Sequence, residues 1–101
     1  MQPMNPSEIY KALSNPVRRE MLEWLKEPGR HFCGDGVQVN EHGVCAGGFE
    51  RCGLSQSTVS AHLACLQRAG LITSERVGQW VYFRRNEETI AAFLKSIHET
   101  L

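Results

Sequence analysis

Residues 31–52, HFCGDGVQVNEHGVCAGGFERC, bring three cysteines and two histidines into one glycine-rich stretch. Thiolates bind soft metal ions, so a Zn(II) or As(III) site at Cys33 and Cys45 is one chemistry that this stretch offers. A disulfide between the same two thiols, formed and broken as a redox switch, is a second. A long loop with scattered cysteines is the third, because the spacing matches no standard zinc signature. The residues leave these three interpretations open.

If the stretch is a sensor, Cys33 and Cys45 are its predicted working residues, with His31, Asp35 and His42 nearby. A thiol must reach solvent and the thiolate form to react, and positions at the edge of a glycine-rich loop allow that. Cys45 is also expected near the start of a helix, where the amide-rich surroundings should lower its pKa.

The whole chain is expected to form a single domain, because 101 residues support one modest hydrophobic core. It has no apolar run of about 18 residues, which predicts no membrane span. The first residues, MQPMNPSEIY, lack the pattern of a signal peptide, so a cytoplasmic protein with reduced cysteines is expected.

Charge is distributed unevenly along the chain although the formal net charge is zero. Residues 51–85 carry five arginines and one glutamate, a local charge of +4. Such a field attracts polyanions and is consistent with a nucleic-acid partner. A solvated basic face without a partner is the alternative.

Four helices are predicted from their N-caps, which are Asn5, Asn15, Ser55 and Asn86. A proline follows each of the first two caps, Pro28-Gly29 should stop the second helix, and Gly70 should end the third. A weaker helix is expected over Val44–Cys52, whose apolar residues keep helical spacing despite Gly47-Gly48.

Two strands joined by a tight turn are predicted between the last two helices. They cover Ile72–Val77 and Trp80–Arg84, and Gly78-Gln79 suits a type II′ turn. Alternation is expected to place one set of side chains toward the core, namely Ile72, Val81 and Phe83. The reverse face should carry Trp80, Tyr82 and Arg84.

The segment CGLSQSTVSAHLACLQRAG is typical of a helix-turn-helix, in which Ser55 caps the helix that enters the DNA major groove. The outward arc of that helix holds small or polar residues, which permit close approach to base edges. An ordinary amphipathic helix is the alternative, but a cationic hairpin directly after it favours a winged helix. The predicted DNA-binding residues are Gln56, Ser57, Thr58, Ser60, His62, Arg68, Arg76, Gln79 and Arg84.

The motifs ALSNPVRREMLEWL and GLSQSTVSAHLACLQRAGLITSERVGQWVYFRR resemble the ArsR family of bacterial winged-helix repressors. The resemblance covers nearly the whole chain outside residues 28–43. It implies a homodimer built from the first and last helices, bound to a palindromic operator and released by an inducer. Apolar residues of those helices support a dimer independently, although they could instead cap the monomer core: Ile9, Leu13, Ile90, Phe93, Leu94 and Ile97.

The chain departs from the metal-sensing members of that family. Their CVC pair is replaced by GVCAGGFERC, with one cysteine in its place. The family's other site, on the last helix, looks absent because Arg85 and Leu101 stand where ligands are expected, which makes His98 a solvated or interface residue. Cys52 stands where the family has a core leucine, so Cys52, like Cys65, is expected to be a packing residue.

Together these features predict a mainly α fold with a β-hairpin wing, a winged helix-turn-helix dimeric through its terminal helices. The predicted function is transcriptional repression by binding double-stranded operator DNA. A winged-helix protein-interaction module without DNA binding is the alternative. An enzyme is not expected, because nothing indicates an oxyanion site or a substrate pocket.

Overall fold

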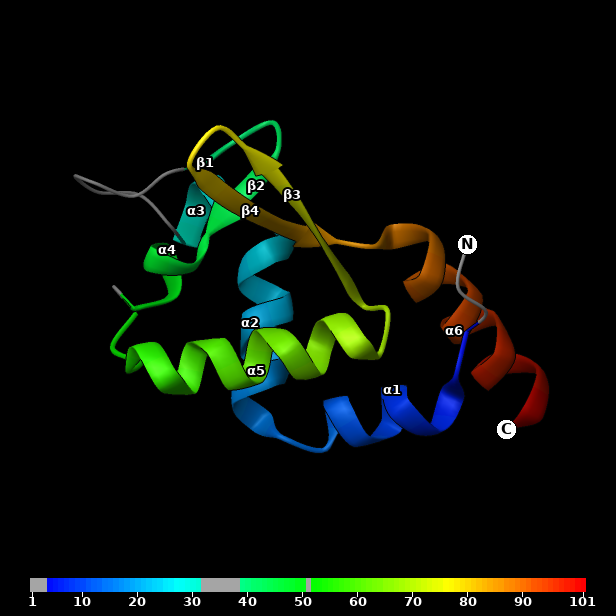
Figure 1. Ribbon diagram of the computed structural model, residues 1–101. Helices are drawn as coiled ribbons and strands as arrows, with labels where there is room; N and C mark the ends of the chain where they lie inside the picture. The colour runs from blue at the N-terminus through cyan, green and yellow to red at the C-terminus, as the bar shows by residue number, and fades with distance from the viewer. Residues whose placement is uncertain (1–3, 32–38, 51) are drawn as a thin grey trace.

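The computed structural model describes residues 4–31, 39–50 and 52–101, with backbone only at His31. The four-stranded sheet lies on one side and helices α5 and α1 lie on the other, with α2 passing between them (Figure 1). The elements in chain order are α1 (Pro6–Leu13), α2 (Pro16–Lys26), α3 (Pro28–His31), β1 (Val39–Asn40), β2 (Gly43–Cys45), α4 (Ala46–Glu50), α5 (Gln56–Arg68), β3 (Ile72–Val77), β4 (Trp80–Arg85) and α6 (Glu87–Thr100).

All four predicted N-caps are confirmed by hydrogen bonds from backbone amides in the first helical turn. The Asn15 side-chain oxygen accepts from the amides of Val17 and Arg18, at 2.8 and 3.2 Å. The oxygens of Asn5, Ser55 and Asn86 each accept from the amide three residues later, at 3.2–3.3 Å. Each bond satisfies a donor that has no partner within the helix, so local sequence alone sets where these helices start.

The hairpin β3–β4 has the predicted strands, with β4 one residue longer than expected, and the predicted turn. Its antiparallel pairs run from Ile72 opposite Arg85 to Val77 opposite Trp80. Gly78 has φ +63°, and no described residue other than glycine has a positive φ, so the turn is of the predicted type II′.

Two further strands, β1 and β2, extend the sheet in the order β1-β2-β4-β3. The predicted helix over Val44–Cys52 is therefore wrong at its start, because Val44 pairs with Phe83 and Cys45 with Tyr82. Gly43 makes this approach possible. Its φ is +123°, and a Cβ there would collide with the carbonyl oxygen of Phe83.

The core lies between the helices and the adjoining face of the sheet. Its fully buried large side chains include Ile9, Met21, Phe49, Leu66 and Ile72. Within the described residues, no helix is long and apolar enough to cross a membrane.

The expected burial of the β4 side chains is corrected at two positions. Val81 points to the core side of the sheet but is 41% exposed, because it lies near the hairpin tip, opposite Arg76. Tyr82 points to the reverse face but is only 4% exposed, because β2 adds Cys45 beside it. The ring of His42 also lies 5.8 Å from the Tyr82 ring.

Candidate nucleic-acid interface

Helix α5 buries one side and exposes the other, as a helix that enters a groove must. Val59, Leu63 and Leu66 face the core. The exposed side carries small or polar residues, which are Gln56, Ser57, Ser60, Ala61, Ala64, Gln67 and Arg68. A backbone that meets DNA over two alanines and two serines can come close to the base edges.

The tight turn before α5 follows from the backbone of residues 52–54. The amides of Cys52 and Gly53 donate to the carbonyls of Phe49 and Glu50, at 3.0 and 3.1 Å. Gly53 has φ +94°, a conformation that glycine adopts without strain. Leu54 packs against the core and holds the turn in place.

Two of the predicted DNA-binding residues on α5 already have partners within the protein. The Ser55 hydroxyl donates to Thr58 Oγ1 at 2.8 Å, so half-buried Thr58 is part of the helix cap. Arg18 Nη1 lies 3.4 Å from Nδ1 of half-buried His62. A guanidinium can only donate, so Nδ1 of His62 accepts, and a contact with DNA could come only from its other ring nitrogen.

Arg18 joins three helices around His62. Its Nε donates to the Ala12 carbonyl at 2.8 Å and its Nη2 to the Lys11 carbonyl at 3.0 Å, both at the end of α1. Burial, and secondarily the charge of Arg18, lowers the pKa of His62 below its ordinary value. The neutral imidazole is therefore the form that this contact requires.

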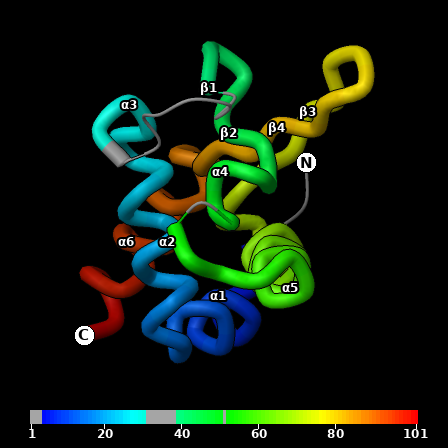
Figure 2. The backbone as a smooth tube through the Cα atoms, turned by 90° about the vertical axis from the view of Figure 1, so that its left-hand side faces the viewer, coloured from blue at the N-terminus to red at the C-terminus, as the bar shows by residue number. Residues whose placement is uncertain are grey.

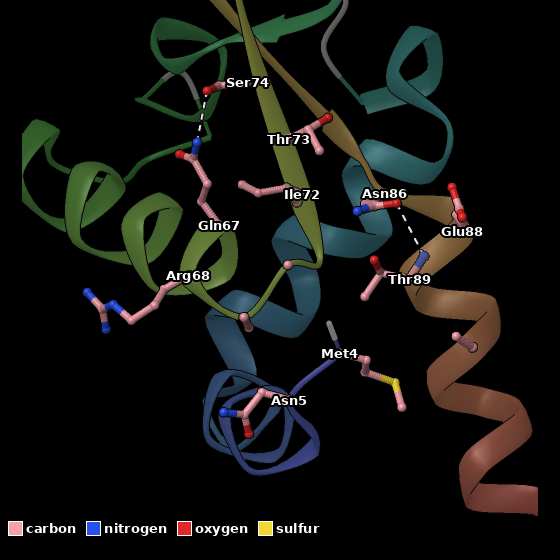
Figure 3. A pocket seen from close by; sticks show the side chains of 13 residues that line it. Met4, Asn5, Gln67, Arg68, Ile72, Thr73, Ser74, Asn86, Glu88 and Thr89 are labelled. Carbon is pink, nitrogen blue, oxygen red and sulfur yellow. Dashed lines mark hydrogen bonds between the residues drawn. The ribbon is translucent and has the colours of Figure 1, made fainter. Parts of the chain in front are cut away.

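The end of α5 is tied to the wing. The Gln67 side-chain amide donates to the Ser74 hydroxyl of β3 at 2.9 Å, a bond drawn in Figure 3. Arg68, the next residue, points away from the protein in the same view. The helix and the hairpin are thus connected by a side-chain contact as well as by the chain.

The arginines of the basic segment differ in their surroundings. Arg76 and Arg84 are exposed but lie on opposite faces of the hairpin, since Arg76 is opposite Val81 and Arg84 is opposite Thr73. Arg85 binds Glu87 at 3.1 Å and donates to the Leu22 carbonyl at 3.1 Å, so its charge has a structural partner. Arg51 lies outside the described residues.

Helix α5 and the hairpin tip share one side of the molecule. Figure 2 shows α5 along its axis and the tip of β3–β4 projecting on the same side, beyond the rest of the sheet. The predicted residue Gln79 lies in that tip and is exposed.

Of the two predicted sensor cysteines, the structure describes only Cys45. Cys33 and Asp35 lie outside the described residues, as does the side chain of His31. Cys45 is buried in β2, and this burial raises its pKa, an effect that a hydrogen bond with Tyr82 opposes but does not reverse. The expected lowering of the Cys45 pKa is therefore wrong, because desolvation outweighs the hydrogen bond with Tyr82.

The predicted packing roles of the other two cysteines are confirmed in one case only. Cys65 is half-buried against the core, whereas Cys52 is exposed in the turn before α5. His42 lies 3.1 Å from Glu75 and 3.5 Å from Glu41, and His98 is exposed. Among the described residues no three His, Cys, Asp or Glu side chains are grouped as metal ligands would be.

The predicted dimer surface is also revised. Ile9 and Phe93 are buried within the single chain, so neither is available to a partner. Leu94 is 59% exposed, and Leu13, Ile90 and Ile97 are half-buried. Tyr10, which the sequence reasoning missed, is 52% exposed and packs edge-on against Phe93, with ring centroids 5.5 Å apart. Its position next to Ile9 on a short terminal helix is the sequence feature that could have identified Tyr10 as part of this surface.

A pocket of about 520 Å³ lies between the end of α5, the start of β3 and the start of α6. Figure 3 shows that its two charged side chains, Arg68 and Glu88, point away from it. Gln67 and Asn86 are hydrogen-bonded to Ser74 and to the Thr89 amide. No converging set of polar groups marks this pocket as a ligand site.

The sequence profile of the family described as "Bacterial regulatory protein, arsR family" matches residues 50–74, the segment from the end of α4 to β3. The uncharacterized HTH-type transcriptional regulator YbzH of Bacillus subtilis is 47% identical over 98 residues, covering 92% of this chain and 98% of that protein. The arsenic resistance transcriptional regulator ArsR1 of Pseudomonas putida is 45% identical, over 93% of this chain and 66% of that protein. The transcriptional repressor SdpR of Bacillus subtilis is 34% identical, over 79% of this chain and 74% of that protein. Their names agree with the prediction of a regulator and not an enzyme.

Solved structures share the fold. An ArsR-like transcriptional regulator from Rhodococcus superposes with a TM-score of 0.69 at 23% identity, covering 93% of this chain and 76% of that one. The homodimeric winged helix-turn-helix domain Mb0332 of Mycobacterium bovis gives a TM-score of 0.61 at 23% identity, over 92% of this chain and 77% of that one. The predicted winged helix-turn-helix fold is confirmed.

Proposed function

The chain belongs to the ArsR family of bacterial regulatory proteins, and from this premise we propose that it is a dimeric, cytoplasmic transcriptional repressor that binds a palindromic operator. The observation that carries the proposal is the exposed side of α5. Its alanines and hydroxyl side chains are short, so the backbone of the helix can approach a partner closely; Arg68 lies at one end of this side and Gln56 at the other. Such a surface fits a major groove better than it fits an acidic or apolar protein partner.

In this proposal α5 lies in the major groove and the wing contacts the flanking backbone. Ser57 and Ser60 reach base edges or phosphates, while Arg68 and Arg76 contact phosphates. Arg84, on the other face of the hairpin, adds to the positive field near the duplex.

The dimer is proposed to form through α1 and α6. Support comes from Tyr10 and Leu94, which leave one large apolar side chain exposed on each of these two helices. The structural neighbour Mb0332 is described as homodimeric. A two-fold dimer presents two copies of α5, and a palindromic operator matches that symmetry.

The inducer is proposed to be an oxidant or a thiophilic ion, Zn(II) or As(III), that acts at Cys33 and Cys45. Support comes from the relative named as an arsenic resistance regulator. Cys45 is opposite Tyr82 in the β2–β4 pair, so chemistry at its buried thiol would disturb β4 and therefore the wing. The inducer would then release the DNA by moving the wing first and α5 afterwards.

The experiment that tests the proposal is binding of the protein to a labelled duplex from its own promoter, followed by fluorescence anisotropy. Ser57→Glu and Ser60→Glu should abolish binding, because each places a carboxylate against the phosphates. Lys26→Gln is the matched control, since it also lowers the net charge by one unit but lies at the end of α2. Binding of both serine variants at wild-type affinity would show that α5 does not contact the DNA.

A further inference from the structure

Helix α1, which the proposed function assigns to the dimer interface, lies beside α5, the helix proposed to enter the major groove (Figure 2). Ala12 of α1 and Leu63 of α5 belong to the same buried core. Apolar contacts of this kind have no preferred direction. They hold the two helices together but permit the small sliding of packed helices that occurs in switching proteins.

Arg18 adds a directional connection between the two helices. From the first turn of α2, its Nε donates to the Ala12 carbonyl at 2.8 Å and its Nη2 to the Lys11 carbonyl at 3.0 Å. Its Nη1 lies 3.4 Å from Nδ1 of His62, near the middle of α5. A guanidinium is planar, and its donors are fixed relative to one another. The three contacts are therefore made together only at one orientation of α5 against the end of α1.

The neighbouring Arg19 offers a comparison within the same chain. Its Nη1 donates to the carbonyl of Leu13, the last residue of α1. Both arginines thus place a cation at the carbonyl end of that helix, where positive charge is favourable. Of these two side chains, Arg18 is the one that also reaches α5.

The orientation of α5 matters because two copies act together on an operator. In a two-fold dimer each copy enters one major groove, and the half-sites lie about 34–36 Å apart, one turn of the duplex. One added base pair moves a half-site about 3.4 Å along the duplex axis and about 35° around it. A dimer discriminates against that change only if α5 is held firmly relative to the helix that contacts the partner.

We propose that Arg18 is a positioning residue, which holds His62 against the end of α1 and thereby selects the spacing of the operator half-sites. The inference rests on the proposed function, including a dimer that uses α1. Arg18 acts here through α5 and not through a contact of its own with DNA. Its loss changes which spacings are bound more than it changes the reading of the bases.

The test compares affinities for operators that differ only in the distance between half-sites. The operator is located in the protein's own promoter by footprinting, and one base pair is added or removed at its centre. Fluorescence anisotropy then gives the affinity of each protein for the three duplexes. Wild-type protein should bind both altered duplexes about tenfold more weakly, a loss comparable with one mismatched base pair. In Arg18→Ala this difference should shrink to about twofold or less.

Arg19→Ala is the matched control and should discriminate as wild type does. It also removes one cation and one bond to the end of α1, but it leaves the contact with α5 in place. Sedimentation and urea unfolding establish that each variant is a folded dimer.

Two variants of His62 leave Arg18 and its bonds to α1 intact, and they decide the outcome if Arg18→Ala does not fold. In His62→Asn the amide oxygen can replace Nδ1 as acceptor. Its spacing selectivity should therefore remain, even if its affinity for every duplex falls. His62→Ala has no acceptor and should discriminate as poorly as Arg18→Ala.

Wild-type spacing selectivity in a folded Arg18→Ala, or in His62→Ala, would overturn the inference. Loss of selectivity in Arg19→Ala would also overturn it, by showing that any weakening at the end of α1 has the same effect. If wild-type protein binds its operator but does not distinguish the three duplexes, the inference fails and the proposed function stands. A failure of wild-type protein to bind any duplex would instead reject the proposed function itself.

Discussion

The side-chain amide of Gln67, near the end of α5, donates a 2.9 Å hydrogen bond to the hydroxyl of Ser74 in β3. Residue Ser74 shares a hairpin face with Arg76, so this bond helps to set the distance between the helix and the cationic wing. Both side chains are exposed, and the bond therefore contributes little to the stability of the fold.

Removal of that bond should affect DNA binding more than folding. Gln67→Ala and Ser74→Ala should each weaken operator binding a few-fold, and the double variant should be no weaker than the worse single one. The coupling in this double-mutant cycle should be about 0.5–1 kcal/mol. Simple additivity of the two effects would show that the bond does not position the wing.

Alanine substitutions of Arg76 and Arg85 should distinguish an arginine that contacts phosphate from an arginine that forms a structural ion pair. Arg76→Ala should weaken binding to all sequences alike and reduce the slope of log affinity against log salt by about 0.9 for each protomer, or about 1.8 for the dimer, because each protomer loses one phosphate contact. Arg85→Ala should instead lower the thermal midpoint, since Arg85 binds Glu87 and the Leu22 carbonyl. A reduced salt slope in Arg85→Ala without a loss of stability would reverse these roles.

Leu94→Asp and Phe93→Asp should differ although the two residues are adjacent. Leu94 is exposed, so its carboxylate variant should fold as a monomer with weak operator binding. Phe93 is buried against Tyr10, and its loss should cost about 3–5 kcal/mol in the free energy of unfolding. Sedimentation and urea unfolding measure the two effects. A dimeric Leu94→Asp would place the interface elsewhere.

The cysteines should react in an order set by exposure. Desolvation raises the pKa of both thiols, Cys45 and Cys52. The two differ in access, because the Cys52 residue is exposed and the Cys45 residue is buried. Alkylation of the folded protein, followed by mass spectrometry, should therefore modify Cys52 well before Cys45. Equal rates would mean that β2 opens readily.

The sensor proposal has its own test with the same thiols. Arsenite or a thiol oxidant should release the operator from wild-type protein but not from Cys33→Ser or Cys45→Ser. The Cys52→Ser variant should respond as wild type does and serves as the control. A fully responsive Cys33→Ser would reject the proposed sensor.

His62 should make stability depend on pH in a defined direction. The pKa of His62 in the folded state lies below the ordinary value of about 6.5. Just below pH 6.5 the imidazole is therefore protonated to a greater extent in the unfolded chain than in the folded one. The contribution of His62 to stability is therefore intact above the ordinary pKa and is lost as the pH falls toward the folded pKa. Urea unfolding between pH 7.5 and 5.5 should show a smaller loss of stability for His62→Gln than for wild type. An identical loss in both proteins would contradict this role.

Local sequence determined the elements that depend on neighbouring residues. The caps at Asn5, Asn15, Ser55 and Asn86 and the glycine-first turn after Val77 each involve groups within four positions of one another. The apolar spacing of α5 likewise separates its buried side from its exposed side. These features are readable because they use short-range hydrogen bonds and one helical period.

Only the tertiary structure decided which residues are covered. Strand β2 has three residues and no periodic signal, and its pairing with β4 joins positions about 40 apart in the chain. That pairing buries Cys45 and Tyr82. The sequence predicts Cys45 at the solvent-accessible edge of a loop and Tyr82 on the face of the hairpin that points away from the core. Packing of α6 on α1 likewise takes Ile9 and Phe93 into the core and leaves Tyr10 and Leu94 outside. An apolar stripe shows that a helix face will be buried, but only the arrangement of the other elements determines whether the same chain or a second copy covers it.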